Sequence, residues 1–200
     1  MIYIEFVSRR PGVALEDFHK AWNDGQEGWG GDYEEDLLVW SGARTWRLGP
    51  EPEYLAVWYV PHAGFDRLDD WDRIFKSGDA DPFEDPFHAA ARIDFGGCYE
   101  SLIEPTKVKG KRYYVELFRP NGPDEDIVDH YEKRAAGGSH ELLVLARRIG
   151  KLAPEPGGLA VWGMDAFADL QGVAEALDGV SQPVELVAAG VYADVGQEEL

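Results

Sequence analysis

Glu5 and His19 are the side chains of this sequence that are best placed for acid–base chemistry. Glu5 lies in the alternating stretch 2–9, where burying a carboxylate without a partner is costly. His19 adjoins the apolar positions Phe18 and Trp22, which recur at helical spacing. An imidazole titrates near neutral pH and can move a proton when a substrate atom comes within hydrogen-bond distance. We therefore name Glu5 and His19 as candidate catalytic residues.

Both residues also have a structural interpretation. Glu5 can pair with a charged group across an internal interface, and His19 can bond to a carbonyl at the edge of its helix. His88, in an aromatic-rich insertion of the first part of the chain, belongs either to a lid over a pocket or to a loop that plugs it.

Most of the tryptophans lie in the first part of the chain, which predicts one working pocket there. Small-molecule pockets are mostly apolar and carry a few convergent polar groups. The same aromatic residues are equally typical of a hydrophobic core. The candidate substrate-binding residues are Trp22, Trp40, Arg44, Tyr54, Trp58 and His88.

The motifs of several common site types are absent from the sequence. It has no metal-ligand spacing, no glycine-rich phosphate loop and no Gly-x-Ser-x-Gly segment. Its single cysteine, Cys98, stands in an apolar context and is expected to be a buried structural thiol. We therefore expect no metal and no organic cofactor.

The charge balance argues against polyanionic partners. Asp and Glu number 38 against 19 Lys and Arg, so the formal net charge of −19 repels nucleic acids and anionic membrane surfaces. No apolar run is long enough to cross a bilayer. We expect a cytoplasmic protein that binds neither nucleic acid nor membrane.

An internal repeat organises the chain. Pro50-Glu51-Pro52 followed by Leu-Ala-Val-Trp returns as Pro154-Glu155-Pro156 followed by the same four residues. Tyr3-Ile4-Glu5 likewise returns as Tyr114-Val115-Glu116, so the order of the segments is kept. Trp58 and Trp162 are equivalent in this repeat. Aligning the first helices of the two copies at Leu15 and Ile127 places Tyr131 opposite His19.

The pattern of each copy predicts the element order βαββαβ. In the first copy we expect helices after Pro11-Gly12 and near 65–76. The strands of that copy are expected near 2–9, 37–47, 54–60 and 92–103. We expect an α+β fold of two tandem ferredoxin-like repeats, residues 1–105 as the active half and 111–200 as the scaffold half. Such a sheet carries both helices on one face, so the two bare faces are expected to pack together as an intramolecular barrel.

The order of elements, the duplication and the segment 15–22, with Phe18, His19 and Trp22, resemble the dimeric α+β barrel superfamily, and within it the EthD-like and antibiotic-biosynthesis-monooxygenase-like members. EthD-like proteins continue this pattern with a second histidine, where this chain has Gln26-Glu27-Gly28. The resemblance implies hydrophobic, aromatic or polyketide-like substrates and oxygenation, isomerisation, cyclisation or dehydration. Some branches use haem.

Our leading hypothesis is a cofactor-independent enzyme, an EthD-like monooxygenase or an isomerase, cyclase or lyase, that acts on a hydrophobic small molecule by proton transfer. One alternative is a non-catalytic small-molecule-binding or stress-type protein. Another is a haem-binding member of the superfamily. We also allow for a homodimer of the whole chain.

Overall fold

The computed structural model describes residues 1–31, 37–44, 53–59, 69, 86–106, 112–137, 140–153, 155–175 and 183–193. The helix predicted near 65–76 lies outside this set, apart from Asp69. The elements of the first half (residues 1–105) are β1 (Ile2–Arg9), α1 (Leu15–Gly31), β2 (Leu37–Arg44), β3 (Tyr54–Tyr59), α3 (Pro86–Ala90) and β4 (Ala91–Ser101). Those of the second half (residues 111–200) are β5 (Arg112–Pro120), α4 (Asp124–Ala136), β6 (Glu141–Arg148), β7 (Gly158–Met164), η1 (Phe167–Asp169), α5 (Leu170–Glu175) and β8 (Val184–Ala193).

The strands form one closed antiparallel barrel in the order β1-β3-β2-β8-β5-β7-β6-β4. The first half contributes β4-β1-β3-β2 and the second half β8-β5-β7-β6, so the two halves have the same internal order. They join where β2 pairs with β8 and where β4 pairs with β6. The barrel therefore consists of two equivalent four-stranded sheets whose edges are closed against each other.

The irregularities of the sheet repeat as well. The pairing of β1 with β4 shifts register between Phe6 and Val7, and that of β5 with β8 shifts between Leu117 and Phe118. Each register shift marks a β-bulge. Glu5 of β1 directly precedes the first shift and Glu116 of β5 directly precedes the second, so the two glutamates occupy the same place relative to the bulge. The sequence repeat thus extends to the backbone geometry.

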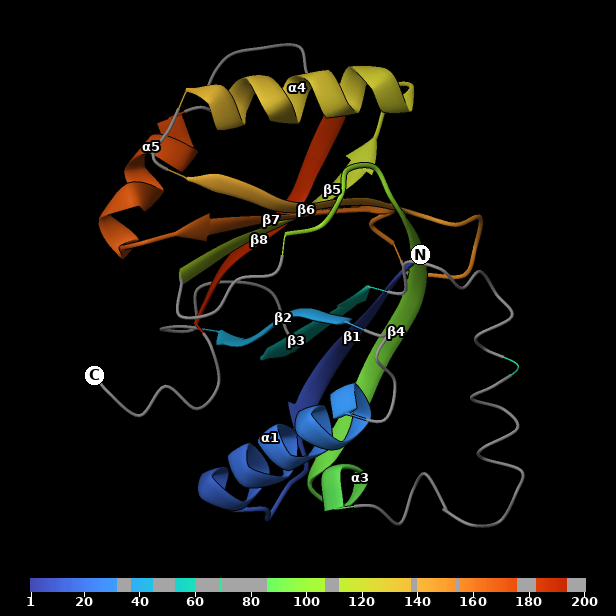
Figure 1. Cartoon of the computed structure of the whole chain (residues 1–200), viewed down its shortest axis with the longest axis vertical. Helices are drawn as coiled ribbons and strands as arrows, with labels where there is room; N and C mark the ends of the chain where they lie inside the picture. The colour runs from blue at the N-terminus through green and yellow to red at the C-terminus, as the bar shows by residue number, and fades with distance from the viewer. Residues whose placement is uncertain are drawn as a thin grey trace.

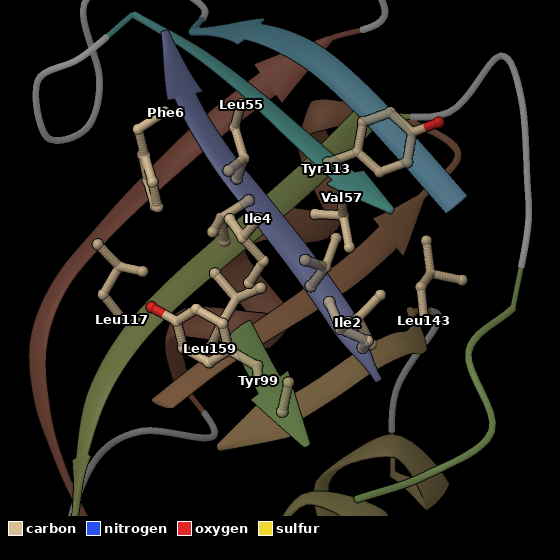
Figure 2. Close-up of a cluster of buried hydrophobic side chains, with 14 of the residues drawn as sticks. Ile2, Ile4, Phe6, Leu55, Val57, Tyr99, Tyr113, Leu117, Leu143 and Leu159 are labelled. Atoms are coloured by element: carbon tan, nitrogen blue, oxygen red, sulfur yellow. The ribbon is translucent and has the colours of Figure 1, made fainter. Parts of the chain in front are cut away.

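The barrel interior is an apolar core formed by side chains from both halves (Figure 2). Ile2, Ile4 and Phe6 point into it from β1, and Tyr113, Val115 and Leu117 point into it from β5. The remaining positions of these strands face outward towards the helices, as Val7 and Phe118 show by packing there. The predicted alternation of β1 is therefore confirmed.

The helices lie outside the barrel, in two layers at opposite ends of the molecule (Figure 1). In the figure α1 and α3 lie beside the strands of the first half, and α4 and α5 beside those of the second half. Separate apolar clusters fill the space between each layer and its sheet. Each half can therefore hold a site of its own between helix and sheet.

Helix α4 carries acidic residues in its first turn and ends at a glycine. Its first turn carries Asp124, Glu125 and Asp126, which favour the positive end of the helix dipole, and Gly137 ends it. Among the described residues no helix is long and apolar enough to span a membrane. Cys98 is free and buried in β4, as predicted.

Candidate functional site

In the first half, aromatic side chains of α1 pack against the sheet. The Phe18 ring lies 4.5 Å from that of Tyr54, and the Trp22 ring 5.5 Å from it. His19 Nε2 is 3.2 Å from the Tyr54 hydroxyl, within hydrogen-bond distance. Burial, with the Arg9 charge next, lowers the pKa of His19, so its imidazole is neutral at pH 7. The structure thus brings His19, Trp22 and Tyr54 together.

Glu5 and Trp58 form a second pair on the same face of the sheet. The indole Nε1 of Trp58 donates a hydrogen bond of 3.3 Å to Glu5 Oε2. Burial raises the pKa of Glu5, while this hydrogen bond and the His88 charge act in the opposite direction. A carboxyl group held by a neutral donor keeps its proton more readily than one held by a cation.

The other predicted binding residues are spread more widely. Arg44 is directly opposite Tyr192, whose side chain lies in the barrel core, and it forms an ion pair of 3.5 Å with Glu53. Arg44 therefore lies on the barrel side of the sheet, apart from His19 and Glu5. The side chain of Trp40 lies outside the described residues.

His88 lies in α3, which runs directly into β4. Its ring lies 5.3 Å from that of Phe87, and its carbonyl accepts a hydrogen bond of 2.8 Å from Arg10 Nε. Phe87 in turn lies 5.8 Å from Trp22. Helix α3, which holds His88, is thus packed against the aromatic side chains of α1.

In the second half a buried ion pair takes the place of the Glu5–Trp58 pair. Arg134 of α4 donates to both carboxylate oxygens of Glu116, at 3.0 and 2.6 Å. Its guanidinium lies 4.8 Å from the Trp162 ring centroid and 5.1 Å from that of Tyr131. Glu116, Tyr131 and Trp162 are fully buried. Arg134 thus combines a bidentate ion pair with two cation–π contacts.

Two histidines lie close to this ion pair. Within the described part of the chain, His130 Nε2 and both ring nitrogens of His140 are buried without a hydrogen-bond partner, as are Arg134 Nε and Trp162 Nε1. Burial, followed by the Arg134 charge, lowers the pKa of both histidines, so both are neutral at pH 7. Buried polar atoms without partners mark a place where a water, ion or ligand belongs.

Sequence reasoning missed this second group. The place of His140 at the end of a loop is typical of a surface residue, whereas His140 is 6% exposed and its ring lies 5.0 Å from Trp162. Arg134 belongs to the charged run Glu132-Lys133-Arg134, which is typical of a solvated helix end. The one usable signal was the repeat itself, because it pairs Glu116 with Glu5.

The helix alignment also changes by one residue. Phe18 and Tyr131 are both fully buried, and each packs on the strand pair below it, on Tyr54 and on Phe118 respectively. Phe18 is therefore the counterpart of Tyr131, and the alignment of Tyr131 with His19 was wrong. By the same offset, the counterpart of Arg134 is Ala21, which is also buried.

Replacing Glu5 with glutamine is expected to stabilise the protein in a pH-dependent way. Because the pKa of Glu5 is raised above its ordinary value of 4.5, the folded state binds more protons than the unfolded state between these two pKa values. Wild-type stability is therefore fully present below pH 4.5 and falls as the pH rises through the folded pKa. The Glu5→Gln variant lacks this loss, of about 1.4 kcal/mol for each unit of pKa shift.

Urea denaturation of both proteins at several pH values measures this effect. The two curves are expected to agree near pH 4 and to separate in favour of Glu5→Gln towards pH 8. Tyr3 on β1 and His88 on α3 are the titratable neighbours of Glu5, so the comparison is repeated in a His88→Ala background. A constant difference across the pH range contradicts the raised pKa.

Comparison with known proteins supports the fold alone. No family model and no curated protein matches the sequence. Among solved structures, a candidate chlorite dismutase superposes with a TM-score of 0.63 at 9% identity over 98% of this chain and 95% of that one. A haem-binding protein from Thermus thermophilus gives 0.59 at 11% identity, over 96% and 90% of the two chains. A cyanide complex of a chlorite dismutase mutant from Candidatus Nitrospira defluvii gives 0.57 at 11%, over 97% and 91%.

Two of these solved structures are thus named as chlorite dismutases and one as a haem-binding protein. The chain shares their mixed α+β fold along nearly its whole length.

Proposed function

We propose that the chain is a haem-binding protein and that its second half holds the haem through the imidazole of His130 or His140. The observation that carries this proposal is a pair of neutral histidines beside the Glu116–Arg134 ion pair, His140 buried and His130 half-buried, whose ring nitrogens His130 Nε2, His140 Nδ1 and His140 Nε2 are buried without a partner. The similar solved structures include a haem-binding protein and chlorite dismutases, which adds support.

The described residues meet the chemical requirements of a haem ligand set. A histidine must be neutral to bind iron. Because the pKa of His130 and that of His140 are lowered from 6.5, both imidazoles stay neutral to a lower pH than an ordinary histidine does. Tyr114, Val128 and Leu142, which are partly buried against the apolar cluster of Phe118, Tyr131 and Trp162, supply apolar surface, and Arg134 supplies a fixed cation. Bound haem would supply redox chemistry at its iron, and His130 or His140 would hold it.

A hemin titration of the purified protein, followed through the Soret band, tests this proposal. Wild type is expected to saturate, and replacing with alanine the histidine that holds the iron, His130 or His140, is expected to weaken binding by at least about 10- to 100-fold, because losing a ligand costs no less than losing the hydrogen-bond support of one. His19→Ala and His88→Ala in the first half are the matched controls and should bind as wild type does. An unshifted spectrum, or loss of binding only in the first-half variants, contradicts the proposal.

A second candidate function rests on the first half. The raised pKa of Glu5 and the contact of His19 with Tyr54 favour acid–base chemistry on a hydrophobic small molecule, as the sequence predicts. Retained turnover of such a substrate in haem-free protein, and its loss in His19→Ala, would favour this function over the first. The EthD-like assignment, a homodimer and a cytoplasmic location stay predictions.

We interpret the two halves as tandem ferredoxin-like repeats. The identical strand order in each half and the matching register shifts support this interpretation. In this arrangement the second half is the haem-binding half, although the sequence alone favours a scaffold role for it.

A further inference from the structure

The surroundings of Arg134 recur in the first half without the arginine. In the second half its guanidinium contacts Glu116, Trp162 and Tyr131. Glu5 and Trp58 are the counterparts of the first two residues, since Glu5 is opposite Ala56 and Glu116 is opposite Ala160 in the corresponding strand pairs.

The remaining two positions complete the comparison. Phe18 corresponds to Tyr131 by burial and by its contacts with the sheet. Three residues further along each helix, Ala21 stands where the second half has Arg134. The first half therefore keeps the carboxylate and both aromatic rings but replaces the cation with a methyl group.

The glutamate of the first half has no arginine or lysine partner among the described residues, and the charge that acts on it is that of the nearby His88. Among the described residues, Glu5 accepts a hydrogen bond only from the neutral Trp58 indole, and it does so through Oε2. Oε1 is therefore the oxygen left for a further donor. No described lysine or arginine forms an ion pair with Glu5, whereas Glu116 is fully compensated by Arg134.

The carboxyl group and the indole of the first half are more open than their counterparts, whereas Phe18 is as fully buried as Tyr131. Glu5 and Trp58 retain part of their solvent-accessible surface, whereas Glu116 and Trp162 are both 0% exposed. The Glu5 carboxyl group and the Trp58 ring are therefore more accessible to a small molecule than Glu116 and Trp162 are.

We propose that Glu5, Trp58 and Phe18 form a binding site for the guanidinium or amidinium group of a small molecule. The ligand cation takes the place that Arg134 occupies in the second half: it lies against the Trp58 ring and donates to Glu5 Oε1. A planar cation suits this site because it combines ring stacking with directed hydrogen bonds to a carboxylate. This site is distinct from the haem site proposed above, and the two can fail separately.

Ethylguanidinium chloride is the probe for this proposal, titrated into haem-free protein at constant ionic strength and followed by calorimetry. Binding is expected to saturate, and Glu5→Gln is expected to weaken it by about 10- to 100-fold, the loss typical of a hydrogen bond to a charged group. Glu16→Gln, at an exposed acidic residue of α1, is the matched control and should leave binding unchanged.

Ala21→Arg provides an independent arm. If Ala21 is the counterpart of Arg134, the new guanidinium occupies the site and abolishes ethylguanidinium binding, while the midpoint of thermal unfolding is retained or raised. Methylammonium chloride tests the preference for a planar cation and is expected to bind at least about tenfold more weakly. The proposal is overturned by equal binding of methylammonium, by unchanged binding in Glu5→Gln, or by heats no larger than those of sodium chloride.

Discussion

Replacing Arg134 with methionine is expected to lower the free energy of unfolding by about 3–5 kcal/mol, the cost of leaving a buried carboxylate without its cation. Glu116 is fully buried and both of its oxygens accept hydrogen bonds from Arg134. Guanidinium chloride denaturation at pH 7 measures the change.

Two further variants separate the buried charge from the lost packing. The double variant Arg134→Met, Glu116→Leu removes both charges and is expected to recover most of the stability. Arg119→Ala breaks the solvent-exposed ion pair with Glu185 and is expected to change little. If Arg134→Met is no more destabilising than Arg119→Ala, the ion pair does not hold the second half together.

Replacing Gly158 with alanine is the second substitution with a large expected effect. A Cβ atom there would lie 2.2 to 2.6 Å from three atoms of the Phe118 ring, far inside van der Waals contact. Overpacking a tight core typically costs about 1–3 kcal/mol and sometimes more. The change in the free energy of unfolding is measured by urea denaturation.

The first half shows how the clash at Gly158 can be relieved. In the first half, Val7 of β1 corresponds to Phe118 and Tyr54 of β3 corresponds to Gly158. The large side chain of that pair is therefore on β3, whereas in the second half it is on β5. Adding Phe118→Val to Gly158→Ala is therefore expected to restore part of the stability. The control is Gly172→Ala in α5, where an added Cβ has no atom within 4 Å and no loss is expected. Equal effects at Gly158 and Gly172 would contradict the packing described.

The strand pattern and the repeat could be predicted because they depend on local sequence. Alternation places Ile2, Ile4 and Phe6 on one face of β1 whatever packs against them, and the barrel core contains all three. The equivalence of Glu5 with Glu116 and of Trp58 with Trp162 was likewise visible as identical residues in the two copies of the sequence repeat. In the structure, one apolar cluster lies between helix and sheet in each half.

The site could not be predicted to the same degree, because it depends on contacts between distant residues. Whether Arg134 is a solvated helix end or a buried partner of Glu116 is decided by the strand that lies below it. The one-residue offset of α1 against α4 likewise follows from contacts with Tyr54 and Phe118. No periodicity within a helix contains that information.

The haem proposal is tested most directly by the number of haem groups that each reconstituted chain carries. After incubation with hemin and removal of the excess, native mass spectrometry of wild type should show one haem per chain, and the double variant His130→Ala, His140→Ala should show none. A wild-type chain that emerges without haem, or a double variant that still carries one, would contradict the assignment of the second half as the haem-binding half.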